Sequence, residues 1–182
     1  MDKKFTLLKS YFEHNGLLLC NESRDLPSLD TVGGDWETVV SLMESGDVFY
    51  SKLYKGRVTY LSRELYYLIK PMKQRIEKLS PQSTELFGIL SSAGPLTTTQ
   101  IKGMLFLPSK AFNSCMDELH KELFITVITR DRDIQQNWSS FCWGNYALWE
   151  QKQISAPPQS RDAIYQMLSA LMPVKQIDSL LK

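Results

Sequence analysis

The chain has 182 residues, of which 43% are hydrophobic and 23% are charged, and its formal net charge is +1. This composition is typical of a globular protein with an ordinary core, and it excludes a largely disordered chain. No apolar run approaches the ~18 residues that a membrane-spanning helix needs, and no uninterrupted apolar signal stretch follows Met1. We therefore expect a cytoplasmic protein that does not associate with a membrane.

The chemistry-bearing residues are sparse. Three cysteines, Cys20, Cys115 and Cys142, are widely spaced and form no Cys-x-x-Cys pair, and the two histidines are His14 and His120. This pattern predicts neither a disulfide framework nor a metal site. The sequence also contains no Walker loop, no Gly-x-Ser-x-Gly and no His-Glu-x-x-His motif. We therefore expect no cofactor, and we assign no catalytic residue.

The first part of the chain predicts two helices joined by a polar loop. Residues 3–14 carry apolar side chains at helical spacing, and residues 21–34 are polar with a Gly-Gly pair. Asp35 is a plausible N-cap for a helix over residues 36–45. Loop aspartates such as Asp25 could hold Mg²⁺ or act as acid and base, but capping of turns and helices is their commoner role.

A hairpin and a long helix follow. β-branched and aromatic residues over 48–61 flank a Lys55-Gly56 turn, which is typical of two antiparallel strands. Ser62 is a candidate cap for a helix that extends to Leu79. Pro71 lies inside this pattern and should kink or split the helix.

Residues 80–150 predict a winged helix-turn-helix domain. The expected elements are a helix capped by Ser83 or Thr84 and ending at Ser92, helices over 97–105 and 109–123, a strand over 124–128, a polar loop over 130–138 and a strand over 140–149. Three helices followed by a hairpin form one compact core. The predicted fold class is therefore α+β, mostly helical.

Three domains are expected. Residues 1–79 combine helices with a basic hairpin and resemble a degenerate winged helix, residues 80–150 form the winged helix-turn-helix, and residues 151–182 are a linker with C-terminal helices. The tandem interpretation requires residues 48–61 to be a two-stranded hairpin. The alternative is that the N-terminal part only decorates a single winged helix with additional helices.

Charge is distributed unevenly along the chain. Residues 52–78 hold eight basic and two acidic side chains, whereas residues 80–150 hold five basic and seven acidic ones. A basic segment of this kind favours contact with phosphates. We expect DNA contacts from this segment, from the third helix of the winged domain and from the wing. The residues are Lys52, Lys55, Arg57, Arg63, Lys110, Asn113, Ser114, Lys121, Arg130 and Arg132.

Each of these groups of residues could also have a purely structural role instead of contacting DNA. Asp117 favours a solvated face for the third helix, and Asp131 and Asp133 favour a wing that is paired with itself. The tyrosines of the basic segment could stack on unpaired bases, but at hairpin and helix spacing they are more often core residues.

A family resemblance adds to this interpretation. The stretch "DVFYSKLYKGRVTYLSRELYYLI", followed by a winged helix ending in "FCWGNYALWE", resembles the AlkZ-related proteins. These are relatives of the YcaQ-like alkylpurine DNA glycosylases, which are built from tandem winged helices. The resemblance covers residues 26–150 and implies a DNA-associated, repair-linked protein.

One departure from the glycosylase pattern affects the expected activity. The glycosylases carry a Gln-x-Gln motif near the start of a much longer chain, whereas Gln151-Lys152-Gln153 here follows the wing. We therefore transfer no catalytic role to it, and we expect a non-catalytic protein that binds DNA weakly. The alternatives are a winged helix that docks a protein partner or a second copy of itself, and a reduced DNA glycosylase.

Overall fold

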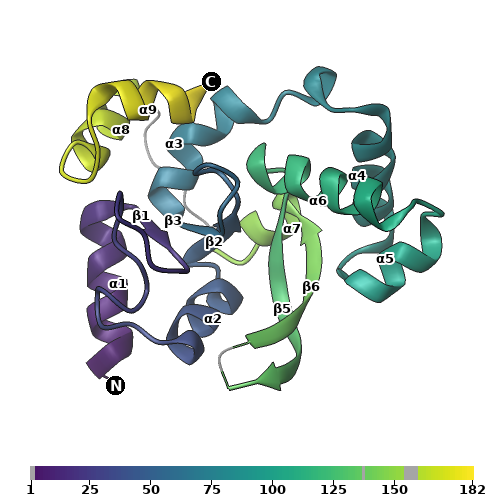
Figure 1. Ribbon diagram of the computed structural model, residues 1–182, viewed down its shortest axis with the longest axis horizontal. Coiled ribbons are helices and arrows are strands. Elements are labelled where there is room, and N and C mark those ends of the chain that lie inside the picture. Colours follow the sequence, from purple (N-terminus) through teal and green to yellow (C-terminus); the bar gives the residue numbers. More distant parts are fainter. Residues whose placement is uncertain (1–2, 137, 154–159) are drawn as a thin grey trace.

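The computed structural model describes residues 3–136, 138–153 and 160–182. It is an α+β structure, mostly helical, with two small antiparallel sheets. The N-terminal elements lie on one side of the molecule and the helices over residues 81–121 lie on the other, with a long β-hairpin between them (Figure 1). Within the described ranges, every helix is too short or too polar to cross a membrane.

The first unit comprises residues 3–73. Its elements are α1 (Lys3–Asn15), β1 (Leu17–Leu19), α2 (Trp36–Ser45), β2 (Val48–Ser51), β3 (Thr59–Ser62) and α3 (Arg63–Lys73). The strands are antiparallel and pair in the order β1-β3-β2, so the hairpin expected over 48–61 is confirmed. β1 was not predicted, because its three leucines are all buried and show no alternation of polar and apolar residues.

Both ends of α2 are fixed as the sequence indicates. The side chain of Asp35 accepts a 2.9 Å hydrogen bond from the Thr38 amide, and Gly46 ends the helix with φ at 83°. Hydrogen bonds from Thr38 and from Lys4 lower the pKa of the Asp35 carboxyl to about 2. The charged cap therefore stabilises the start of this helix at all ordinary pH values.

The second unit comprises residues 81–145. Its elements are α4 (Pro81–Ala93), β4 (Leu96–Thr97), α5 (Thr98–Met104), α6 (Ser109–Lys121), β5 (Ile125–Gln135) and β6 (Trp138–Asn145). The strands are again antiparallel, in the order β4-β6-β5. The three predicted helices are therefore present, and their apolar faces enclose a core that includes Leu86, Ile101 and Phe112.

The wing differs from the expectation in two respects. The polar stretch 130–138 was predicted to be a loop, but β5 extends to Gln135 and pairs with β6 from Trp138 onward. The returning strand was predicted to reach Trp149, but it ends at Asn145, whose side chain accepts a hydrogen bond from the Leu148 amide and caps α7 (Tyr146–Glu150). The first error arises because an exposed ribbon needs no apolar face, which removes the pattern used for prediction. The second arises because apolar residues continue beyond Asn145, where the capped helix α7 begins instead.

The helix boundaries near residue 80 also differ from the prediction. α3 continues through Pro71 but ends at Lys73, and a short 3-10 helix, η1 (Ile76–Lys78), follows. The N-cap of α4 is Ser80 rather than Ser83 or Thr84. Glu118 of α6 accepts hydrogen bonds from the Ser80 amide and hydroxyl at 3.1 and 2.7 Å, which ties α6 to the positive end of α4.

The C-terminal helices, α8 (Arg161–Leu168) and α9 (Val174–Leu181), complete the core of the first unit. Ile164, Leu168 and Ile177 are fully buried and cluster with Leu65 of α3 and with Trp149. Figure 1 shows both helices lying over α3. The linker expected over 154–160 lies, up to residue 159, outside the described residues.

Candidate functional site

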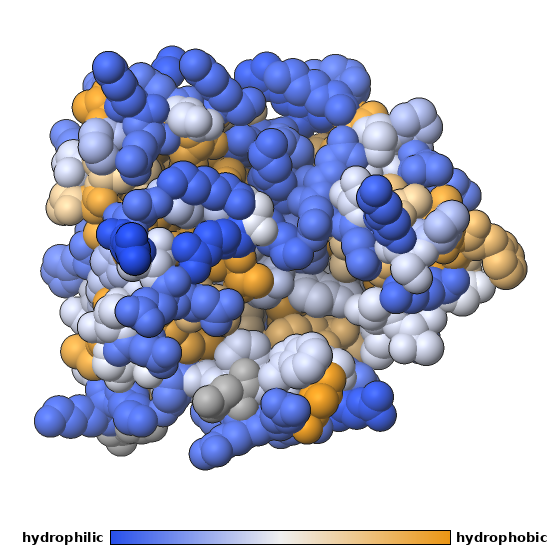
Figure 2. Space-filling view, in the orientation of Figure 1, coloured by the Kyte–Doolittle hydropathy of each residue, from blue (hydrophilic) through white to orange (hydrophobic). Residues whose placement is uncertain are grey.

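A groove separates the first unit from the second. It consists of two adjoining hollows of about 640 and 350 Å³, and both are lined by Tyr50 of β2, Trp143 of β6 and Thr98 of α5. In Figure 2, pale and apolar atoms occupy the recess between the two halves of the molecule, and hydrophilic atoms surround it. We call this feature the inter-unit groove. Both volumes fall within the roughly 300–1,000 Å³ of small-molecule pockets.

The two units meet at the base of the groove. The Thr126 hydroxyl of β5 accepts a 2.9 Å hydrogen bond from the Tyr50 amide and lies 3.1 Å from the Tyr50 carbonyl oxygen. Trp143 is held from the other side, because its Nε1 donates a 3.0 Å hydrogen bond to the Thr98 hydroxyl. The two aromatic walls are therefore held by polar contacts, and their rings lie at a steep angle to each other with centroids 5.2 Å apart.

A buried histidine joins these two walls. The His120 ring lies edge-on, with its centroid 5.0 Å from that of Tyr50 and 4.7 Å from that of Trp143. Burial, with a smaller effect of the nearby Lys52 ammonium, lowers the pKa of His120 to about 3. The imidazole is therefore neutral at physiological pH and offers hydrogen-bonding atoms rather than charge.

Four of the ten predicted contact residues line the inter-unit groove or border it directly. Arg132 is exposed on β5 beside the larger hollow, while Lys52 and Asn113 line the smaller one. Lys52 forms a 2.5 Å ion pair with Asp117 of α6. Arg57 donates hydrogen bonds to the carbonyl oxygens of Asn21 and Glu22, at the edge of the larger hollow.

A further hollow of about 230 Å³ lies at the end of α6, between the loop that follows β2 and α9. It brings together Lys55, from the loop between β2 and β3, and Lys121, from the end of α6. Lys55 is exposed and forms a 2.7 Å ion pair with Asp25, which lowers the pKa of that carboxyl. The basic loop and the third helix of the second unit therefore face each other, although they are far apart in the sequence.

Lys110 and Ser114 are also exposed on α6, closer to its start. Neither contributes a side-chain hydrogen bond or ion pair to the contacts seen among the described residues. They therefore extend the polar face of α6 beyond the groove itself.

Arg63 does not reach the surface. It is 8% exposed, and its guanidinium donates hydrogen bonds to the carbonyl oxygens of Gly46, Glu150 and Gln153 at 2.9, 2.7 and 2.6 Å. The guanidinium carbon also lies 4.5 Å from the ring centroid of Trp149. This arrangement is that of a buried cation that links the end of the second unit to the first unit.

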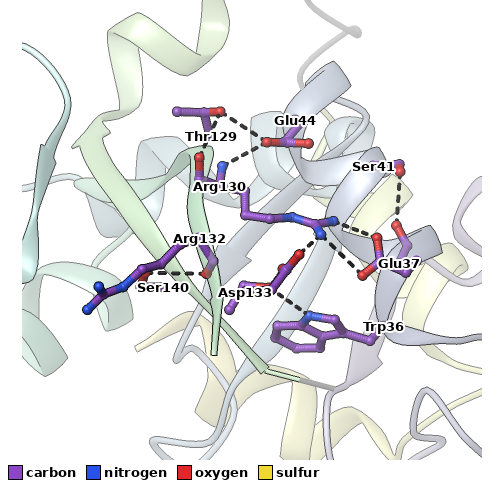
Figure 3. A network of polar contacts seen from close by, with 10 residues as sticks. Trp36, Glu37, Ser41, Glu44, Thr129, Arg130, Arg132, Asp133 and Ser140 are labelled. Atoms are coloured by element: carbon purple, nitrogen blue, oxygen red, sulfur yellow. Dashed lines mark hydrogen bonds and ion pairs between the residues drawn. The ribbon is translucent and has the colours of Figure 1, made fainter. Parts of the chain in front are cut away.

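Arg130 faces the first unit rather than solvent. Figure 3 shows its guanidinium against Glu37 of α2 and Asp133 of its own strand. Both terminal nitrogens donate to Glu37, at 3.1 and 2.8 Å, in a bidentate arrangement. The Arg130 amide donates to Glu44 as well, at 2.7 Å. The hairpin formed by β5 and β6 is therefore clamped to α2 through this residue.

The Gln-x-Gln segment takes part in the same joint between the units. Lys152 donates hydrogen bonds to the carbonyl oxygens of Met43, Glu44 and Ile128, and Gln153 donates to the Ser45 carbonyl and to Asp47. Its side chains hold the backbone of α2 and β5. In residues 3–136, 138–153 and 160–182, no group of three or more His, Cys, Asp or Glu side chains is placed to hold a metal ion.

The sequence analysis missed the aromatic lining of the groove. Trp36, Trp143 and His120 were not singled out, and Tyr50 was grouped with four other tyrosines. Of those four, Tyr54, Tyr60 and Tyr66 are buried and Tyr67 is half-buried, as expected for core residues. No local pattern distinguishes a tyrosine at an interface from a tyrosine in a core, because the difference depends on the other unit.

Comparison with known protein families supports the resemblance described above. A model of the AlkZ-related family matches residues 21–182. The chain belongs to the AlkZ-related family. This membership associates the protein with the relatives of a DNA-repair glycosylase. Comparisons with curated proteins and with solved structures give no further match.

Proposed function

We propose that this AlkZ-related protein is a non-catalytic, repair-associated DNA-binding protein built from two winged helices, of which the first is degenerate. The supporting observation is the shared topology of the two units. In the second unit, helix, strand, two helices and a hairpin follow one another, with the first strand beside the last. This is the order and pairing expected of a winged helix-turn-helix.

The first unit repeats this plan with one replacement. α1, β1, α2, β2 and β3 correspond in order to α4, β4, α6, β5 and β6, and the strand order β1-β3-β2 matches β4-β6-β5. The loop over residues 20–35 stands where α5 would be. We infer that the absence of this helix makes the first copy degenerate, and that its hairpin instead lines the inter-unit groove.

The groove offers the chemistry that DNA requires. Lys52, Lys55 and Lys121 can neutralise phosphates along α6, and Arg132 can do so at the wing. Asn113 can reach a base edge from the helix that would be the recognition helix. α2, the corresponding helix of the first unit, is covered by the wing through Arg130, so we assign reading of the duplex to α6.

Binding of a short duplex to two matched double variants tests this proposal. Lys52→Ala with Arg132→Ala removes two groove cations, whereas Lys3→Ala with Arg161→Ala removes the same charge from α1 and α8. We expect the groove variant to bind about tenfold more weakly in fluorescence anisotropy and the control to change less than about twofold. Equal losses would show that net charge alone, rather than the groove, governs binding.

A second candidate function rests on a separate observation. Met104, at the end of α5, and Phe106, between α5 and α6, are 51% and 96% exposed, and Figure 2 shows an apolar projection at this edge of the molecule. Exposed apolar residues of this kind are typical of protein-docking surfaces. Under this alternative, Phe106→Ser would abolish association with a protein partner or with a second copy. The groove variant, Lys52→Ala with Arg132→Ala, would leave that association unchanged.

A further inference from the structure

A histidine that lines the smaller hollow of the inter-unit groove carries a buried ring nitrogen without an internal partner. His120 is only 2% exposed, and its Nδ1 forms no hydrogen bond with any residue that the structure describes. Buried polar atoms of folded proteins are almost always paired, so an unpaired one requires an explanation. His120 lines this hollow, where a ligand can approach the ring.

The surroundings of this atom favour a flat, neutral ligand. Tyr50 and Trp143, each in edge contact with the histidine, supply half-buried aromatic surface, and Asn113 supplies an amide at the rim. Asp117 lies on the same rim, where its carboxylate repels anions and offsets the positive charge of Lys52 inside the hollow. A phosphate is therefore a poor fit here, although it suits the cations outside the hollow.

We propose that the smaller hollow takes one unpaired nucleobase of the bound DNA, which stacks against Tyr50 or Trp143 and hydrogen-bonds to His120 and Asn113. This inference rests on the proposed DNA binding and names the part of the DNA that is recognised. Stacking on an aromatic side chain is tolerant of base identity, because every base has an aromatic face. The amide of Asn113 and the imidazole of His120 can both donate and accept, so they can meet a Watson–Crick edge.

Three DNA probes of matched sequence test this assignment with the full-length protein. One is a fully paired duplex, one carries a single central unpaired base, and one carries an abasic-site analogue at that position. The last two have the same backbone charge and the same number of nucleotides, and they differ in chemistry only by the base. We expect the unpaired base to bind about tenfold more tightly than the abasic analogue, a factor within the range of base–aromatic stacking.

Two variants locate the preference in this hollow. Asn113→Ala shortens an exposed side chain. His120→Leu replaces the buried imidazole, with its unpaired nitrogen, by an apolar side chain. Each should reduce the preference for the unpaired base over the abasic analogue to less than about threefold. Asn113→Ala should in addition weaken binding of all three probes by a common factor, because Asn113 belongs to the proposed duplex contact, whereas His120→Leu should leave binding of the paired duplex unchanged. Circular dichroism checks the fold of His120→Leu, and Asn113→Ala alone suffices if that variant unfolds.

The outcomes separate the two proposals. Equal binding of the unpaired base and the abasic analogue by the unaltered protein would overturn the base pocket while leaving DNA binding intact. A uniform loss of affinity for all three probes in both variants, with the preference for the unpaired base retained, would show that neither residue holds the base, and it would also overturn the assignment. Absence of salt-sensitive binding to any probe would overturn the DNA-binding function itself, and the pocket with it.

Discussion

His120 makes the stability of the protein depend on pH. Burial depresses its pKa to about 3 in the folded state, whereas an unfolded histidine titrates near 6.5. Between these values the unfolded chain binds a proton that the folded chain does not, so stability falls as the pH decreases through this window. We expect the unfolding free energy to be lower at pH 5 than at pH 7.5 by about 2 kcal/mol from this residue alone.

Urea denaturation at several pH values measures this effect. The comparison is restricted to pH 5–7.5, above the titration of most carboxylates. In His120→Leu the slope of stability against pH should be flatter over this interval. An unchanged slope in the variant would mean that another group is responsible for the acid sensitivity.

Of the two arginines of β5, Arg130 should contribute to stability and Arg132 to DNA binding. Arg130→Ala breaks the bidentate contact with Glu37 and is expected to lower the unfolding free energy by about 1 kcal/mol. Arg132→Ala removes an exposed side chain at the groove and should leave stability within about 0.5 kcal/mol of the unaltered protein, while weakening DNA binding. Thermal unfolding and fluorescence anisotropy of both variants provide the test, and interchanged effects would contradict the assigned roles.

At the scale of elements, the sequence predicts the interiors of helices better than it predicts strands and junctions. Asp35 and Gly46 delimit α2 as expected, because capping chemistry is local. β1 and β4 were missed, since three buried leucines and a two-residue strand carry no periodic signal. The extended wing was missed because an exposed polar ribbon is held by its partner strand rather than by its own pattern.

The candidate site was predictable only in part for the same reason. The charge asymmetry identified Lys52, Lys55 and Arg57, and helix periodicity identified the exposed face of α6 that carries Asn113 and Lys121. The convergence of these two groups depends on how the units pack, which no single segment encodes. Arg63 illustrates the limit, since its carbonyl partners lie 17, 87 and 90 residues away.

At the scale of the whole molecule, the C-terminal helices should stabilise a unit that is distant from them in the sequence. Leu168 is fully buried against the core of the first unit. We expect Leu168→Ala to lower the unfolding free energy by roughly 2–5 kcal/mol, because it leaves a cavity beneath α3. Urea denaturation followed by tryptophan fluorescence measures the change, and Lys175→Ala on the exposed side of α9 is the control.

The joint between the units also predicts how unfolding proceeds. Arg63 and Lys152 link residues near the end of the second unit to the backbone of the first. The Leu168→Ala variant should therefore unfold in a single transition at lower urea, rather than in two separated steps. A first unit that melts alone while the second persists would show that the units are independent.

The salt dependence of duplex binding tests the central claim most directly. If Lys52 and Arg132 of the inter-unit groove and Lys55 and Lys121 of the further hollow meet phosphates, with up to two neighbouring cations, four to six contacts form. A plot of the logarithm of the association constant against the logarithm of the salt concentration should then have a slope of roughly −4 to −5. The account predicts this slope for the unaltered protein and a shallower one for Lys52→Ala with Arg132→Ala. Binding that is indifferent to salt, or a slope that the double variant leaves unchanged, would contradict it.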